Sequence, residues 1–258
     1  MSDARFGMLT IFFPMWNEED YINRTLRAAR LVCEELMDEG EIGDYELLVV
    51  DDASTDGTGA IADARAAEDP RIRVVHHPVN RKLGGSLKTG FAEARGELVL
   101  YTDADLPFDL GEVHKAISLL DMYEADIVSA YRLDRTGEGP RRAIYSFVYN
   151  GLLRYGLGMR LRDVNFAFKL CRRRIFDHIQ LESEGSFVDA ELLLRATRLG
   201  YRVIQFGVDY FPRTRGVSAL SSMPVITHIL REMFTLDRHL RKLGPLPAEE
   251  LALPPPQR

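Results

Sequence analysis

The segment VLYTDADLPFDL, residues 99–110, decides how this chain is interpreted. Its apolar start stops abruptly at Asp103-Ala104-Asp105. In an extended segment the side chains of residues i and i+2 point the same way, so two carboxylates would converge there. They would repel each other unless a cation lay between them. Mg²⁺ or Mn²⁺ suits two carboxylates together with substrate phosphates, so we expect Asp103 and Asp105 to hold such an ion against a diphosphate.

The composition indicates a soluble globular protein with a sizeable core, since 46% of the 258 residues are hydrophobic and 28% are charged. No stretch has the pattern of a signal peptide, and none has the ~18 uncharged apolar residues of a membrane span. We therefore expect a cytoplasmic protein, or one that lies peripherally on the cytoplasmic face of a membrane. Cys33 and Cys171 match no metal-ligand spacing, so we expect buried free thiols.

The charge of the chain is unevenly distributed. The net charge is −6, yet residues 131–175 carry 11 Lys and Arg against three acidic residues. A basic block within an acidic chain attracts anions such as phosphates, anionic lipids or nucleic acid. Nucleic-acid binding would leave the paired carboxylates unexplained, so we expect no nucleic acid among the partners of this protein.

The first half of the chain alternates buried apolar runs with segments of helical periodicity. This alternation predicts an α/β protein with a doubly wound, mostly parallel sheet. We expect Asn17 to cap the first helix, and Asp109 with Glu112 to form a capping box for the fourth. The predicted strands are 8–14, 45–52, 72–77, 97–102 and 125–132, and the predicted helices lie near 17–36, 57–68, 85–95 and 109–120.

Beyond residue 132 the pattern changes. The Pro-rich end, 244–258, is expected to be a disordered tail. The predicted elements before it are a helix over 141–155, a half-exposed strand over 165–173, a helix over 187–200 that ends at Gly200, a strand over 201–210 and an amphipathic helix over 222–243.

Polar residues follow three of the predicted strands, at 14–18, 51–58 and 103–105. In open α/β sheets, ligands bind beyond the carboxyl ends of the strands, where the strand order reverses. The chain has neither a Walker lysine loop nor a G-x-G-x-x-G after its first strand, which disfavours P-loop and dinucleotide-binding proteins. The three strand ends therefore predict one site for a metal ion and a diphosphate.

Four basic residues near these strand ends have a simpler interpretation. His76 and His77 have no third ligand nearby that would make a metal site, so we expect surface histidines. Lys82 and Lys88 flank a Gly-rich turn, and we expect them to be solvated lysines.

Four motifs in this order, PMWNEE (14–19), VVDDASTDGT (49–58), TDADL (102–106) and DYFPRTRGVSAL (209–220), resemble those of the GT-A-fold, family 2 glycosyltransferases. The resemblance covers roughly residues 8–220 and is closest to the enzymes that make polyprenyl-phosphate sugars, dolichol-phosphate mannose synthase and its glucosyl relatives. It implies a single GT-A domain over 1–243. The nucleotide-sugar half would span about 8–130 and the acceptor half about 131–243.

The resemblance also implies roles for individual residues. Pro107 stands where some relatives have a Gln that can ligate the metal, and Ala219 stands where a Lys is usual. The implied site comprises Pro14, Trp16 and Glu18 in the nucleotide pocket, Val50 and Asp52 at the base and ribose, Asp103, Ala104 and Asp105 at the diphosphate and metal, Arg132 and Arg213 on phosphates of donor or acceptor, and Asp163 on the acceptor side.

The activity that the resemblance implies is inverting transfer of a hexose from GDP-mannose or UDP-glucose to a polyprenyl or dolichyl phosphate. Residues 141–155 and 222–243 would lie on a membrane surface or pack on the domain itself, and a membrane partner subunit would be a further contact. Asp189 and Glu191 lie at the start of the helix predicted over 187–200, and we expect them to cap it. One alternative is a soluble family 2 transferase that acts on a saccharide or small molecule, and Asp189 or Glu191 would then be the base. Another is a non-catalytic nucleotide-binding subunit.

Overall fold

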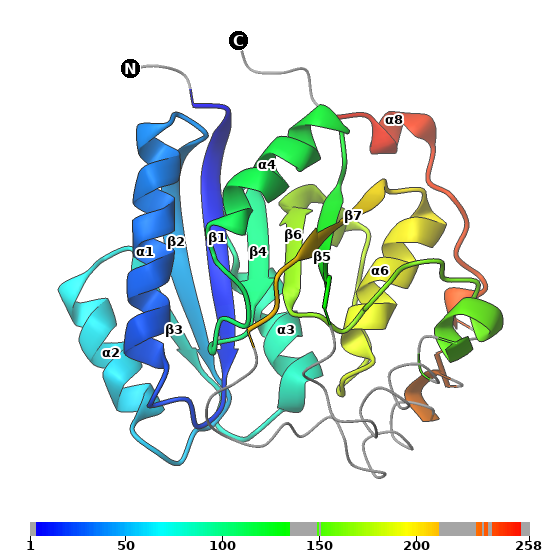
Figure 1. Ribbon diagram of the computed structural model, residues 1–258. Helices are drawn as coiled ribbons and strands as arrows, with labels where there is room; N and C mark the ends of the chain where they lie inside the picture. The colour runs from blue at the N-terminus through cyan, green and yellow to red at the C-terminus, as the bar shows by residue number, and fades with distance from the viewer. Residues whose placement is uncertain are drawn as a thin grey trace.

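The fold is built on one seven-stranded sheet with the strand order β3-β2-β1-β4-β6-β5-β7 (Figure 1). The computed structural model describes residues 4–134, 149, 151–211, 231–233, 235–236 and 239–253. Only β6 runs antiparallel to its neighbours, so the predicted doubly wound, mostly parallel sheet is confirmed. The strands are β1 Phe6–Met15, β2 Ile42–Asp51, β3 Ile72–His76, β4 Leu98–Thr102, β5 Ile127–Arg132, β6 Phe168–Arg172 and β7 Val203–Val208.

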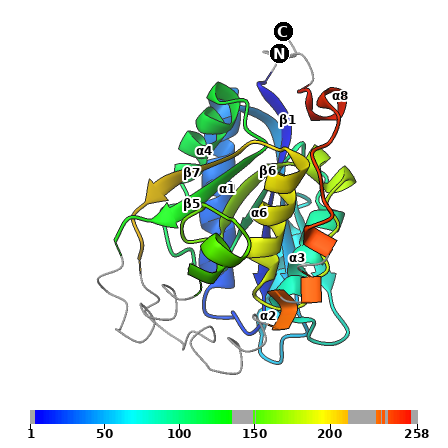
Figure 2. The same ribbon diagram turned by 90° about the vertical axis from the view of Figure 1, so that its right-hand side faces the viewer.

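Helices cover both faces of the sheet. Helices α1 and α4 lie on one face and α3 and α6 on the other (Figures 1 and 2). None of the helices in the described part of the chain is both long and apolar enough to cross a membrane. The helices are α1 Ile22–Asp38, α2 Thr58–Glu68, α3 Lys82–Glu93, α4 Glu112–Met122, the short 3₁₀ helix η1 Arg173–Asp177, α6 Val188–Leu199 and α8 Ala248–Leu251.

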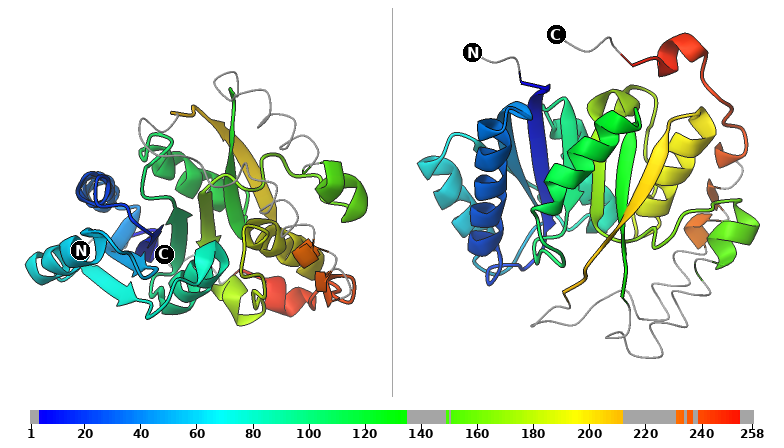
Figure 3. Two further views of the ribbon diagram at one scale, coloured as in Figure 1. Left: turned by 90° about the horizontal axis from the view of Figure 1, so that it is seen from below. Right: turned by 45° about the horizontal axis from the view of Figure 1, so that its top comes forward.

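The order of the strands reverses between β1 and β4, because β1 pairs with β2 on one side and β4 on the other. The chain winds outward from β1 through β2 to β3 and then returns to β4. The carboxyl ends of these four parallel strands share one edge, which faces the viewer in the left panel of Figure 3. This edge is therefore where a ligand of an open α/β sheet is expected.

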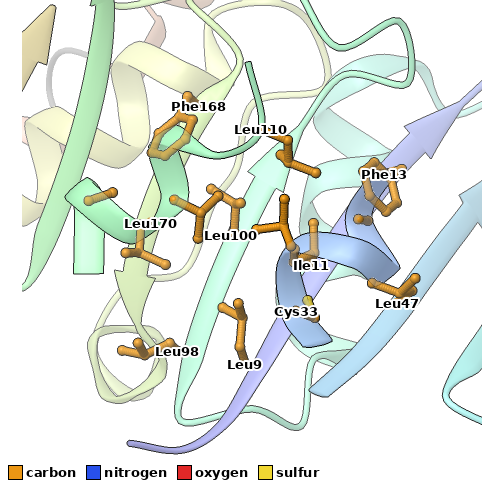
Figure 4. Packing of buried hydrophobic residues seen from close by; sticks show 14 of the residues in the cluster. Leu9, Ile11, Phe13, Cys33, Leu47, Leu98, Leu100, Leu110, Phe168 and Leu170 are labelled. Atoms are coloured by element: carbon orange, nitrogen blue, oxygen red, sulfur yellow. The ribbon is translucent and has the colours of Figure 1, made fainter. Parts of the chain in front are cut away.

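The hydrophobic core has two layers, one on each face of the sheet. Leu9, Ile11 and Phe13 of β1 pack toward α1 and α4, while Phe12 faces α3, as a two-residue strand period requires. Figure 4 shows Cys33 of α1 beside Ile11 and Leu47. Helix α1 buries the apolar residues of one face, as its helical periodicity predicted, and the expected burial of the free Cys33 thiol is confirmed. Burial raises the pKa of this thiol above its ordinary value.

The two predicted helix caps are wrong. Helix α1 begins only at Ile22, and Asn17 instead has a positive φ of 57° and accepts a hydrogen bond from the backbone N–H of Thr55. Helix α4 has Gly111 at its N-cap position without a side-chain cap, and Asp109 accepts from Gly111 N at 2.9 Å. Both side chains stabilise the loops before their helices, so the residue types were suited to turns but not placed at the caps.

Strand β6 is fully buried, not half-exposed as predicted. It lies between β4 and β5 and is covered on both faces, so its alternation of polar and apolar residues does not indicate exposure. The polar residues Lys169 and Arg172 are buried within the protein. The alternation instead marks charged groups that have partners inside the fold.

The C-terminal residues also differ from expectation where the structure describes them. Residues 244–253 contain α8 and contact the domain, with Leu246 N donating to Leu199 O at 2.9 Å and Arg174 donating to the carbonyls of Leu251 and Ala252. Gly200 ends α6 with a φ of 95°, as predicted.

The two predicted amphipathic segments lie only partly within the described residues. Residues 151–156 are helical, whereas 141–148 fall outside the described range. In the segment 222–243, Met233, Leu236 and Leu240 are buried against α6 and its neighbours. This part of the segment packs on the domain, and the part before residue 231 lies outside the described residues.

The close packing of α3 on β1 requires a residue without a side chain at position 90, which is Gly90. A Cβ at this position would overlap the ring of Phe12, so we expect Gly90→Ala to lower the free energy of unfolding by about 1–3 kcal/mol. Gly151→Ala is the matched control, because the described residues place no heavy atom within 4 Å of a Cβ there. Urea unfolding followed by circular dichroism measures both variants. If Gly90→Ala were as stable as Gly151→Ala and the wild type, this account of the α3–β1 contact would be contradicted.

Candidate functional site

The loops after β1 and β2 are held together at the carboxyl edge of the sheet. Asn17 N donates to Ser54 Oγ at 3.0 Å, and Glu18 N donates to Thr58 Oγ1 at 2.8 Å. The carboxylate of Glu19 accepts from Gly57 N at 2.7 Å. These hydrogen bonds fix the loops after β1 and β2 relative to each other.

Residues with strained backbone conformations lie at the same edge of the sheet. Among the described non-glycine residues with a positive φ, all but Glu124 lie at this edge, in its loops or, for Lys82, at the first residue of α3. Such conformations cost about 1–3 kcal/mol each and are retained where the surrounding structure requires them, typically at binding sites. The residues are Asn17, Ala53, Lys82, Leu106 and Asp163.

Asp103 and Asp105 follow β4 within one tight turn. Leu106 N donates to Asp103 O at 3.3 Å, so the pair does not continue the strand as the sequence argument assumed. Both side chains are half-buried. Burial raises the pKa of Tyr101 well above its ordinary value, and the charges of Asp189, Asp103 and Asp105 raise it further. The two carboxylates therefore act on the same buried phenol.

The residues of this turn fit a hard divalent cation by the chemistry of their oxygen donors. Pro107 is buried and offers no ligand, as expected from the sequence. Within the described ranges no group of three or more His, Cys, Asp or Glu side chains is arranged to hold a metal ion. An ion at this turn would thus rely on two carboxylates, on water and on the phosphates of its substrate.

Two histidines pair with the two aspartates at the end of β2. The parallel register aligns Asp51 with His76, and His76 Nδ1 lies 2.8 Å from Asp51 Oδ2. Hydrogen bonds with Asp63 and Asp51 raise the pKa of His76. On the opposite face of the sheet, His77 Nδ1 lies 2.6 Å from Asp52 Oδ1. The prediction of two surface histidines is wrong for His77, which is 7% exposed.

The residues predicted around the nucleotide are distributed between surface and core. Trp16 is 56% exposed at the end of β1, and Pro14 and Glu18 are half-buried beside it. Val50 and Ala104 are buried in the core, so a nucleotide contact from either side chain would need movement of its neighbours. Asp52 is also largely buried, at 3% exposed. The structure thus brings Trp16 and Glu18 to the edge but keeps the side chains of Val50 and Ala104 beneath it.

Arg132 and Asp163 are brought together by the structure. Arg132 Nε donates to Asp163 Oδ2 at 2.7 Å, and Nη2 donates to Oδ1 at 2.6 Å, a bidentate geometry that fixes the guanidinium. Asp163 therefore fixes the direction of the Arg132 guanidinium. Their roles toward donor and acceptor stay predictions, and Arg213 lies outside the described residues.

A second buried ion pair lies behind the turn that carries the aspartates. Lys169 Nζ on β6 lies 2.7 Å from Asp189 Oδ1 on α6 and donates to Phe166 O at 2.5 Å. Lys169 is 0% exposed and Asp189 is 2% exposed. Burial raises the pKa of Asp189, while the charge of Lys169 opposes this rise. The carboxylate is enclosed and paired with a cation.

Neither Asp189 nor Glu191 caps α6, whose N-cap position has no side-chain hydrogen bond. Glu191 is 0% exposed and accepts from the backbone N–H groups of Glu182 and Ser183 and from Arg195 Nε. It stabilises the loop before α6 from inside the protein. The expectation of capping is therefore wrong for both carboxylates.

The lysines near the Gly-rich turn also differ from each other. Lys82 is exposed, as predicted, and begins α3. Lys88 instead pairs with Glu184 in the loop before α6. Gly84 allows this loop to approach α3, because a Cβ at Gly84 would overlap the backbone of Ser183 and Glu184.

A doubly wound sheet with polar loops at its reversal point is typical of α/β proteins that bind a ligand there. The chain belongs to glycosyl transferase family 2, since the model of that family matches residues 10–180. The resemblance noted in the sequence is thereby confirmed.

Two relatives illustrate the family. Glycosyltransferase AglD of Haloferax volcanii is 34% identical over 210 residues, which cover 80% of this chain but only 33% of AglD. Undecaprenyl-phosphate mannosyltransferase of Micrococcus luteus is 30% identical over 227 residues, covering 83% of this chain and 87% of the relative. The chain thus spans about a third of AglD and most of the mannosyltransferase.

Solved structures have the same fold. Glucosyl-3-phosphoglycerate synthase from Mycobacterium tuberculosis, in complex with Mn²⁺, UDP and glucosyl-3-phosphoglycerate, superposes with a TM-score of 0.65. The sequences are 22% identical, and the superposition covers 90% of this chain and 80% of that one. This likeness confirms the predicted GT-A fold.

The Lys169–Asp189 pair predicts strongly coupled effects on stability. Lys169→Met or Asp189→Leu alone leaves a buried charge without its partner and should lower the free energy of unfolding by about 3–5 kcal/mol. The double variant should recover to within about 2 kcal/mol of the wild type, because neither charge remains. Urea denaturation of the four proteins completes a double-mutant cycle. Single effects that simply add would contradict the pairing.

Proposed function

We propose that this chain is an inverting glycosyltransferase that moves a hexose from a nucleoside-diphosphate sugar to a polyprenyl phosphate. The family supplies the reaction class, and two relatives act on lipid phosphates by name. They are the undecaprenyl-phosphate mannosyltransferase and the polyprenol monophosphomannose synthase of Mycolicibacterium smegmatis, which is 29% identical over 82% of this chain.

The observation that carries the choice of acceptor is the burial of Asp189 and Glu191. A sugar or alcohol hydroxyl needs a base that can reach its proton, and a positioned base contributes about 10²–10⁴-fold to the rate. Asp189 is enclosed with Lys169, and Glu191 is enclosed with Arg195 and backbone N–H groups. A phosphate acceptor is already an anion and needs no such base. This favours a lipid phosphate over a saccharide.

The donor diphosphate is proposed to lie at the reversal point of the sheet, over the turn that carries Asp103 and Asp105. These two residues would hold Mg²⁺ or Mn²⁺, and the bound ion would offset the charge that develops on the leaving diphosphate. The nucleoside would lie toward Asp52 and Trp16, at the ends of β2 and β1. The glucosyl-3-phosphoglycerate synthase with Mn²⁺ and UDP-glucose supports a divalent ion in this fold.

The chain's own residues would then position the two substrates for one in-line displacement. The acceptor phosphate attacks the anomeric carbon from the side opposite the leaving diphosphate, which inverts the configuration. Arg132, fixed by Asp163, and Arg213 are proposed to steer phosphates on the acceptor side. Because a polyprenyl phosphate resides in a membrane, the proposal also places this domain at the cytoplasmic membrane face, alone or with a membrane partner subunit.

The donor and acceptor are tested together with labelled UDP-glucose or GDP-mannose, Mn²⁺ and a polyprenyl phosphate in detergent. We expect label in an organic-extractable product that mild acid releases, with inverted anomeric configuration by nuclear magnetic resonance. A saccharide pool in a parallel reaction should stay unlabelled. Label found only in water-soluble saccharide would contradict the lipid acceptor, and hydrolysis of the donor alone would contradict the transfer.

The double variant Lys169→Met with Asp189→Leu sharpens this experiment. Since a phosphate acceptor needs no base, the double variant should transfer sugar to polyprenyl phosphate at a rate within about tenfold of the wild type. A loss of about 10³-fold in a folded double variant would instead assign Asp189 as the base and favour a hydroxyl acceptor.

A further inference from the structure

His77 lies behind the proposed nucleoside site, in a position that its exposed neighbour His76 does not share. It follows β3 and faces α3, where its side chain is 4% exposed. Its two ring nitrogens each have a partner on a different element. Nδ1 lies 2.6 Å from Asp52 Oδ1 after β2, and Nε2 lies 2.9 Å from Thr89 Oγ1 on α3.

The partners determine which nitrogen carries the proton. An ionised carboxylate only accepts hydrogen bonds, so His77 Nδ1–H is the donor to Asp52. In the neutral ring Nε2 is then an acceptor, and the hydroxyl of Thr89 donates to it. The hydrogen bonds therefore all run in one direction, from Thr89 on α3 to His77 and from His77 to Asp52.

This chain of hydrogen bonds fixes the orientation of the Asp52 carboxylate. Arg81 N also donates to Asp52 Oδ1, at 2.7 Å, while Asp52 N donates to Met15 O at 2.8 Å. Within the part of the chain that the structure describes, both hydrogen bonds to this carboxylate end on Oδ1. Asp52 is only 3% exposed, and Oδ2 is not among its fully buried atoms, so Oδ2 is the oxygen left to meet a donor group of a ligand.

We propose that His77, supported by Thr89, is a positioning residue for the nucleoside of the sugar donor. It holds Asp52 so that Oδ2 accepts an N–H or O–H group from the base or ribose. The inference rests on the proposed function, because it takes the predicted contact of Asp52 with the nucleoside as its starting point. His77 itself touches neither the nucleotide nor the reacting atoms.

The test measures binding of UDP and GDP in the presence of Mn²⁺ by calorimetry, together with kcat and KM for the sugar donor. His77→Phe removes the donor to Asp52 and should weaken nucleotide binding and raise the donor KM by about tenfold or more. The kcat should stay within about threefold, because the reacting groups are unchanged.

Two further variants separate positioning from a general effect on the fold. His77→Asn places an amide N–H close to the position of Nδ1 and should keep the dissociation constant within about threefold of the wild type. His178→Phe removes a histidine that also contacts a carboxylate, Glu250, but at the opposite edge of the sheet. Nucleotide binding should be unchanged in this control.

Three results would overturn the inference. The first is wild-type nucleotide affinity in His77→Phe, and the second is equal weakening in His77→Asn and His77→Phe. The third is a loss confined to kcat, which a smaller folded fraction would produce. Because binding is measured without acceptor, a wrong acceptor leaves this test intact. A wild type that binds neither nucleotide would contradict both the inference and the proposed function.

Discussion

Two carboxylates in one turn, Asp103 and Asp105, impose the constraint on which the rest of the site depends. They lie at the end of β4, next to the reversal point of the sheet, where parallel strand ends leave room for a ligand. Two carboxylates in one short turn offer the oxygen ligands that a hard divalent cation prefers, together with the phosphates of a substrate. The fold therefore provides an edge suited to a divalent ion and an anionic substrate.

The neighbouring charges are compensated inside the protein. Asp52 pairs with His77, Arg132 with Asp163 and Lys169 with Asp189, and each pair joins two separate segments of the chain. Burying such pairs costs desolvation, and losing one partner would leave an uncompensated charge, so the pairs fix geometry more than they add stability. The pairs fix the positions of the segments around the carboxyl edge of the sheet. The Lys169–Asp189 pair also encloses the carboxylate that a hydroxyl acceptor would need as a base.

Features that depend on local sequence could be predicted. The continuous apolar strands, the helical stripe of α1 and the polar residues after β1, β2 and β4 all follow from periodicity and composition. The pairs could not, because each depends on how segments that are distant in sequence pack together. Asp52 and His77 are 25 residues apart, and the parallel register of β2 and β3 aligns them. The sequence feature that could have predicted this pairing is the adjacent histidines, His76 and His77, after one strand and the adjacent aspartates, Asp51 and Asp52, at the end of its neighbour.

The central claim is that a divalent ion joins the Asp103–Asp105 turn to a diphosphate. Calorimetric titration of UDP and GDP with Mn²⁺, and again with a chelator, tests it in the wild type, Asp105→Asn and Asp109→Asn. Asp109 is a matched control because its exposed carboxylate only stabilises the next turn. We predict that Mn²⁺ tightens binding by at least about tenfold, about 1.4 kcal/mol, in the wild type and Asp109→Asn. This gain should vanish in Asp105→Asn, and an undiminished gain in that variant would contradict the account.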